Sequence, residues 1–173
     1  MSGDASDILT KHVLPLVHYE KYNRALCLLD PYGLHLDWAA IEMAGKSGAV
    51  DLVLNFPVMD MNMNAIWHNP QAVPEDGIER MNKFWGDESW RKIAYVDHPQ
   101  QELFGAPPKV KQPNEIVVEA FITRLKKVAG FKHVARPYPM KNSTKAVVYY
   151  LILASAKEVA KDIVEGIFEK YDR

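Results

Sequence analysis

The sequence predicts an α/β protein with a mixed β-sheet, and three observations support this fold class. Two short apolar segments, Ala25–Leu29 and residues 49–54, each follow a helical pattern and are closed by turn residues. Residues 131–154 have the pattern of an antiparallel hairpin. Helices that alternate with fully apolar strands are typical of a parallel sheet. We therefore expect two parallel strands, an antiparallel terminal hairpin and helices on both faces of the sheet.

The N-terminal elements follow from their caps and breakers. A first helix should begin after Asp4 or Ser6, since both residue types cap helix N-termini. Pro15 should end or kink that helix, because proline removes a backbone donor. The uninterrupted apolar run Ala25–Leu29 favours a strand covered on both faces. A second helix should begin after Asp37 and lead into the next strand.

Residues 58–112 give weaker signals, and we expect an irregular insertion or lid there. Methionines alternate with polar residues over positions 59–63, which indicates packing in the core or in a lid. Residues 78–85 have the apolar spacing of a short amphipathic helix. Residues 97–113 contain several prolines and few periodic apolar residues, which predicts an irregular loop.

The last third of the chain predicts a helix, a hairpin and a closing helix. Residues 114–129 carry apolar side chains at helical spacing. Pro137 and Pro139 place the first hairpin strand at an edge, whereas residues 146–154 are apolar on both faces and should be interior. A helix should close the chain over residues 156–171. Its expected inward-facing residues are Val159, Ile163, Ile167 and Phe168.

The composition limits the class of protein. The chain has 173 residues, of which 48% are hydrophobic and 25% are charged, so we expect a single domain spanning residues 1–173. The formal net charge of -1 argues against a strongly basic nucleic-acid-binding module. Because the chain has one cysteine, a disulfide framework and a cysteine zinc cluster are excluded.

The sequence also indicates a cellular location. Its longest apolar runs are far shorter than the roughly 20 residues that a membrane span requires. Residues 1–7 are small and acidic, without the basic and apolar regions of a secretory signal. We therefore expect a cytoplasmic protein.

The strongest candidate site is the tetrapeptide Asp30-Pro31-Tyr32-Gly33, which closes the first predicted strand. In an open α/β sheet, ligands bind beyond the carboxyl ends of the strands. The carboxylate of Asp30 could accept a hydrogen bond from an amino group, and the ring of Tyr32 could stack on a base. Methylation of an amine or base requires such groups. The alternative is an ordinary turn, since aspartate, proline and glycine all favour turns.

Two further segments are candidates for the same cleft. Asn55, Phe56 and Pro57 follow the second strand and could bind substrate, with a plain strand end as the alternative. Gly3 and Asp4 precede the first helix and could bring a carboxylate to a polar ligand atom, although the sequence favours Asp4 as the cap of that helix. The histidines form no recognised metal-ligand spacing, and the chain has no glycine-rich nucleotide motif.

Three segments together resemble the three-Cys-motif partner protein family. They are residues 24–38, which contain Leu-Asp-Pro-Tyr-Gly, residues 51–57, which contain Leu-Asn-Phe-Pro, and residues 78–86. That family is similar to class I S-adenosylmethionine-dependent methyltransferases, whose Rossmann-like sheet has seven strands and ends in an antiparallel hairpin. The resemblance implies methyl transfer to an amine or base.

The resemblance also implies roles for residues of this chain. Asp30, Pro31, Tyr32 and Gly33 would be catalytic, next to the methyl donor and acceptor. The residues implied to contact S-adenosylmethionine are Gly3, Asp4 and Asp30.

The matched region corresponds to the C-terminal half of a methyltransferase fold, downstream of its glycine-rich cofactor loop. The resemblance therefore implies that this chain alone binds S-adenosylmethionine poorly, and that Ala25–Leu29 lies at an open edge of the sheet. An apolar edge strand invites pairing with another chain. We expect the missing N-terminal half, a partner chain or a second copy to cover it.

Two other functions stay open. The chain could be a non-catalytic interaction module that keeps the methyltransferase-like shape and binds a partner protein. Binding of nucleic acid through Lys109, Lys111, Lys141 and Lys145 is a weaker alternative, because the net charge gives little attraction for phosphates.

Overall fold

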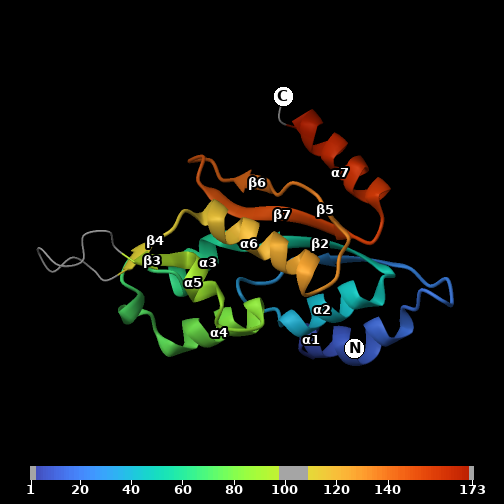
Figure 1. The fold of residues 1–173 in the computed structure, drawn as a ribbon, viewed down its shortest axis with the longest axis horizontal. Helices are drawn as coiled ribbons and strands as arrows, with labels where there is room; N and C mark the ends of the chain where they lie inside the picture. The colour runs from blue at the N-terminus through green and yellow to red at the C-terminus, as the bar shows by residue number, and fades with distance from the viewer. Residues whose placement is uncertain (1–2, 98–108, 172–173) are drawn as a thin grey trace, which may run out of the picture.

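The protein is built around one mixed β-sheet, seen in a computed structural model that describes residues 3–97 and 109–171 (Figure 1). Its strands run in the order β1-β2-β7-β5, and β6 also pairs with β7. Strands β1 and β2 are parallel, whereas β7 is antiparallel to β2, β5 and β6. The predicted parallel pair and terminal hairpin are thus confirmed. The strands of this sheet are β1 (Ala25–Leu29), β2 (Val50–Phe56), β5 (His133–Val134), β6 (Tyr138–Lys141) and β7 (Val147–Ser155).

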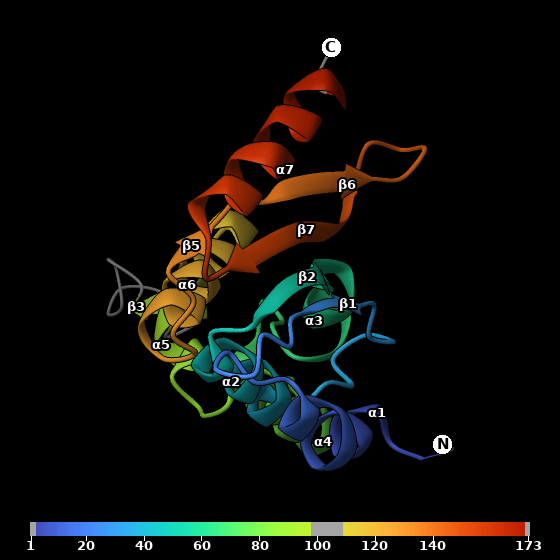
Figure 2. The same cartoon turned by 90° about the vertical axis from the view of Figure 1, so that its right-hand side faces the viewer.

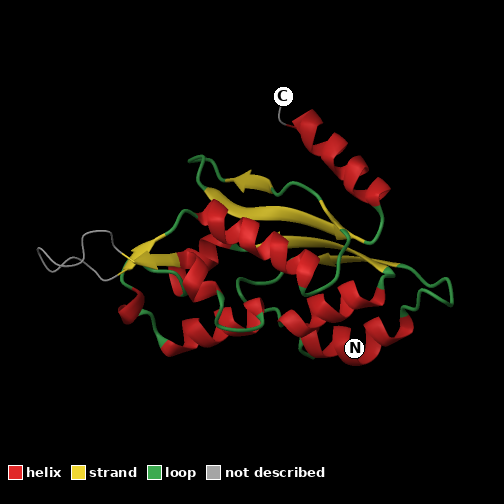
Figure 3. Ribbon diagram, in the orientation of Figure 1, coloured by secondary structure: helices red, strands yellow, loops and turns green. Residues whose placement is uncertain are grey.

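Helices surround the sheet, and a small second ladder lies beside them. That ladder pairs β3 (Tyr95–Asp97) with β4 (Lys109–Lys111). Figure 3 shows the helices gathered mainly below and in front of the sheet. None of the helices in residues 3–97 and 109–171 combines the length and hydropathy needed to cross a membrane. The helices are α1 (Ala5–Ile8), η1 (Leu9–Val13), η2 (Leu14–Leu16), α2 (Trp38–Ser47), α3 (Val58–Asn64), η3 (Pro70–Ala72), α4 (Glu75–Trp85), α5 (Trp90–Ala94), α6 (Asn114–Lys127) and α7 (Glu158–Tyr171).

The main core lies on one face of the sheet. Side chains alternate along a strand, and in β2 the residues Leu52, Leu54 and Phe56 all point into this core and are fully buried. The ring of Phe121 in α6 packs against Phe56 at 4.8 Å and lies parallel to Phe84 of α4 at 5.6 Å. Aromatic packing between α4, α6 and β2 therefore joins the helices to the sheet.

The opposite face of the sheet is covered by α7 over β6 and β7. Leu153 of β7 is buried there, and Phe168 of α7 stacks on Tyr138 at 4.7 Å. Farther along the same face, Leu26 and Leu28 of β1 remain 64% and 69% exposed. The prediction that Ala25–Leu29 is covered on both faces is therefore wrong, because no described element packs on that part of the face. The strand does lie at the edge of the sheet, as the resemblance implies.

Helix α7 is amphipathic, but it turns one stripe of its apolar residues away from the sheet. Val159, Ile163 and Ile167, all predicted to face inward, are 63%, 59% and 43% exposed, whereas Phe168 is buried as expected. Toward the sheet, the carboxylate of Glu165 accepts the Arg136 N–H at 3.0 Å. This hydrogen bond and the ion pair with Lys161 lower the pKa of Glu165. Figure 2 shows α7 rising away from the rest of the molecule toward the C-terminus.

The outward orientation of α7 leads to a stability prediction. We expect Ile163→Ser to change the free energy of unfolding by less than about 0.5 kcal/mol, because the side chain already faces water. Phe168→Leu should cost about 1 kcal/mol through loss of the ring stacking with Tyr138. Urea unfolding of the two variants measures the difference. A larger cost for Ile163→Ser than for Phe168→Leu would contradict this orientation.

The segment over residues 58–112 is not irregular where it is described. It forms α3, α4 and α5, and contributes buried Phe84, Trp85 and Trp90 to the core. The predicted amphipathic helix over residues 78–85 is confirmed within α4. Positions 98–108 of the predicted loop lie outside the described residues. The short helices α3 and α5 have too few turns for their periodicity to stand out in the sequence.

Candidate functional site

A hollow of about 290 Å³ opens where β1 and β2 end and β7 begins. Because β1 and β2 are parallel, their carboxyl ends meet at the same edge of the sheet, where α/β proteins bind ligands. This juxtaposition was predicted from the sequence. The predicted residues that line the hollow are Asp30, Pro31, Tyr32, Gly33, Asn55 and Pro57.

Asp30 and Asn55 form the polar centre of this pocket. The parallel register pairs Leu29 with Leu54, so the next residues of the two strands lie side by side. The amide Nδ2 of Asn55 donates a hydrogen bond to Oδ1 of Asp30 at 2.7 Å. This bond fixes the orientation of the carboxylate, which is exposed at the mouth of the pocket.

The ring of Tyr32 stands beside this carboxylate and is open to solvent. Tyr32 is 89% exposed. The ring lies at 6.1 Å from the imidazole of His35, with 29° between the two planes. A planar ligand could stack on such a ring, because aromatic faces attract one another in offset geometry.

Asp60 of α3 fixes the loop that carries Tyr32 and Gly33. Its Oδ2 accepts the Leu34 N–H at 3.1 Å, and its Oδ1 accepts from Nδ2 of Asn64 at 2.8 Å. Gly33 has φ +60°, and a Cβ atom built there would lie 2.6 Å from the Asp60 carboxylate. The loop therefore needs glycine at this position, both for its backbone conformation and for the close approach of Asp60.

Three predicted site residues lie elsewhere. Phe56 is fully buried and packs against Phe84 and Phe121, because it follows Asn55 in a strand and so points to the opposite face. The carboxylate of Asp4 accepts the Asp7 N–H at 3.1 Å and caps α1, as the alternative interpretation predicted. Neither Asp4 nor Gly3 is among the residues that line the pocket.

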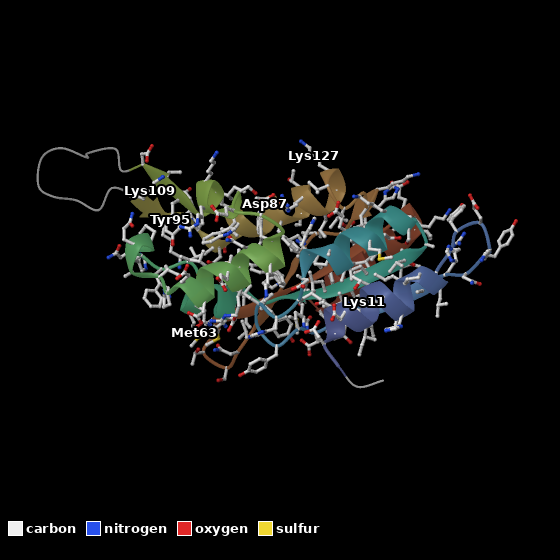
Figure 4. All side chains as sticks on the ribbon, turned by 90° about the horizontal axis from the view of Figure 1, so that it is seen from below. Lys11, Met63, Asp87, Tyr95, Lys109 and Lys127 are labelled. Carbon is white, nitrogen blue, oxygen red and sulfur yellow. The ribbon has the colours of Figure 1, made fainter. Side chains whose placement is uncertain are left out.

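Sequence reasoning missed part of the pocket wall. The lining residues of α3 were not predicted because an irregular insertion was expected there. Those of β7 were not predicted because that strand was expected to be interior. A signal was present for Asp60 and Asn64, which are four residues apart and thus share one side of a helix. Figure 4 shows Met63 of α3 among the side chains seen from below. The missed lining residues are Met59, Asp60, Met63, Val148 and Tyr149.

The chemistry of the lining favours one class of ligand. Asp30 and Asp60 contribute two carboxylates, and the lining residues, all within the described chain, include no lysine, arginine or histidine. Anionic groups such as phosphates would be repelled. The methionine and tyrosine side chains add apolar surface. The arrangement therefore suits a neutral or cationic, planar ligand that donates hydrogen bonds.

The residues present do not fit a whole S-adenosylmethionine molecule. That cofactor carries an adenosine, a sulfonium and an amino acid group, each of which needs partners. The pocket lining has no backbone loop rich in glycine, and Gly3 and Asp4 lie apart from it. The lining residues therefore offer partners for only part of such a molecule.

The described part of the chain also offers no obvious metal centre. Within residues 3–97 and 109–171, no group of three or more histidine, cysteine, aspartate or glutamate side chains lies close enough together to hold a metal ion.

Comparisons of the chain with protein-family models, with curated proteins and with solved structures find no match.

Proposed function

We propose that the pocket at Asp30 binds the amino group of an amine or nucleobase that accepts a methyl group, in a protein of the class I methyltransferase type. The observation that carries this proposal is the Asp30–Asn55 pair at the ends of two adjacent parallel strands, beside the exposed ring of Tyr32. A fixed carboxylate accepts a hydrogen bond from an amino group, and a neighbouring ring holds the plane of the base.

The arrangement of the sheet supports the resemblance to the three-Cys-motif partner family. The terminal strands β6 and β7 are antiparallel, as in the sheet that the resemblance implies, and β1 stands at its edge. The loop after β1 carries the Asp-Pro-Tyr-Gly segment on which the resemblance depends. S-adenosylmethionine is the methyl donor that the resemblance implies, and the proposal assigns acceptor binding alone to these residues.

Two nucleosides that differ only in the 6-amino group test the proposal. Purine riboside has a hydrogen where adenosine has its amino group, so we expect adenosine to bind at least about tenfold more tightly, since a hydrogen bond to a charged group contributes about 1.5–3 kcal/mol. Asp30→Ala should remove this preference. Titration followed by NMR chemical shifts measures both affinities, including weak ones.

Asp37→Ala provides the matched control. Asp37 is also exposed, it makes no capping hydrogen bond through its side chain, and it lies outside the pocket lining. This variant should keep the preference for adenosine. Equal binding of adenosine and purine riboside, or a preference that survives Asp30→Ala, would contradict the proposed role of Asp30.

A further inference from the structure

Strand β1 is an edge without the usual protection against pairing. Natural edge strands are commonly interrupted by lysine, proline or a bulge, whereas Ala25–Leu29 contains five uncharged residues and none of these devices. One side of the strand pairs with β2, and β1 ends the sheet on its other side. Leu26 and Leu28 are also largely exposed. The strand thus presents both free backbone groups and apolar side chains.

The backbone groups that face outward can be identified. The Ala25 N–H donates to the Ala49 carbonyl at 3.0 Å, so Ala25 faces β2. In a parallel pair, alternate residues direct both N–H and C=O groups to the same neighbour. Cys27 and Leu29 therefore also face β2, and the outward N–H and C=O groups are those of Leu26 and Leu28.

We propose that two copies of this chain pair through their β1 strands, antiparallel, about a twofold axis at Cys27. In this register Leu26 lies opposite Leu28 of the second copy, so the outward backbone groups of both strands meet as hydrogen-bonded pairs. All five residues of β1 find a partner. A twofold axis repeats every contact, as expected for a self-complementary interface.

Charge complementarity indicates that the partner of the β1 edge is a second copy of this chain. Arg24 and Asp30 flank β1 at its two ends, three residues on either side of Cys27. The antiparallel register therefore places Arg24 opposite Asp30 of the second copy, and does so twice. Shifting the register by two residues would separate these charges and leave two strand residues unpaired.

Both charged groups have capacity for this contact. Arg24 uses Nη1 on the Tyr19 carbonyl at 3.1 Å and lies over the Tyr19 ring at 4.0 Å. A guanidinium has five N–H donors, so others can serve a carboxylate. Asp30 receives the Asn55 amide on Oδ1, and a carboxylate can accept several hydrogen bonds.

The pairing does not rest on the proposed function, but it affects the same pocket. Arg24 of the second copy would lie next to Asp30, the group proposed to bind an amine. A strand from a donor-binding partner would need the same edge of the sheet. The dimer is therefore the state in which the acceptor pocket is blocked.

Oligomeric state tests the interface. We expect sedimentation equilibrium to show a reversible dimer at micromolar concentration. Leu26→Lys or Leu28→Lys should weaken it at least about tenfold, because each new charge then lies opposite a leucine and the two lysines are diagonal neighbours on the same face. Ile163→Lys is the matched control, since Ile163 is similarly exposed but lies on α7. A monomer throughout the micromolar range, or a dimer weakened by Ile163→Lys and not by Leu26→Lys, would overturn the proposal.

Two further measurements test the register. Arg24→Asp should weaken the dimer, and Arg24→Asp combined with Asp30→Arg should restore it, because the opposite charges then meet again with their positions exchanged. Cys27 and its copy would form a non-hydrogen-bonded pair with Cα atoms about 4.5 Å apart, which a disulfide can bridge. Mild oxidation should therefore link wild type covalently but not Leu26→Lys.

Burial raises the pKa of the Cys27 thiol, so the oxidation is done at about pH 9, where more thiolate forms. Cys27→Ala should remove the covalent link and keep the reversible dimer. A dimer that never links through Cys27, or charge reversal that fails to restore pairing, would overturn this register.

Discussion

Phe121→Ala is expected to lower the free energy of unfolding by about 3–5 kcal/mol, the usual cost of removing a buried phenylalanine ring. Phe121 is fully buried in α6. Its ring lies within 4.8 to 5.8 Å of four other aromatic rings, from β2, α4 and α2. The alanine would leave a cavity at the point where these elements meet. The four rings are those of Trp38, Phe56, Phe84 and Trp85.

A loss of this size is a large share of the total stability of a domain, which is about 5–15 kcal/mol. Thermal unfolding should show it as a fall in Tm of roughly 6–20 °C for a chain of this length. Ile116→Ala in the same helix is the control, because Ile116 is 47% exposed and should cost well under half as much. Similar losses in the two variants would show that Phe121 is not the centre of the core.

Gly33→Ala is expected to destabilise the protein by about 2–4 kcal/mol, from two separate causes. The first is the left-handed backbone conformation, with φ +60°. The second is the approach of a new Cβ atom to 2.6 Å from the Asp60 carboxylate. Because Asp60 also holds the Leu34 N–H, the loop cannot move aside without losing that hydrogen bond.

Gly48→Ala separates the two causes. Gly48 has φ +62° but no atom within 4 Å of a built Cβ, so its substitution measures the backbone strain alone. Urea unfolding should give a clearly larger loss for Gly33→Ala, and the adenosine preference of the pocket should weaken as the loop shifts. Equal losses in the two variants would show that the contact with Asp60 adds nothing.

The sequence indicates the sheet well because its strands have local signals. Apolar runs closed by turn residues predict β1 and β2, and the prolines of the hairpin predict an edge strand. The same apolar run in β1 could not show whether both of its faces are covered, since coverage depends on which elements pack there. Helix α7 has the same ambiguity: its periodicity defines two faces but not which one meets the sheet.

The candidate site was predictable to a similar extent. The rule that ligands bind at the carboxyl ends of parallel strands predicts that Asp30 and Asn55 lie together. Period-2 alternation would also have excluded Phe56, had the strand been extended to include it. Asp60 was not predictable as a partner of Gly33 and Leu34, because that contact joins helix α3 to the loop after β1 through the tertiary fold.

Phe168 is the single buried residue of α7, and this affects the local stability of the helix. Local openings cost little free energy where few apolar groups leave their neighbours. Phe168 packs this helix against the sheet. The exposed side chains of Val159, Ile163 and Ile167 add little to that packing. We therefore expect α7 to open locally while the aromatic core stays intact, so its backbone amide protons should exchange with solvent faster than those of α6.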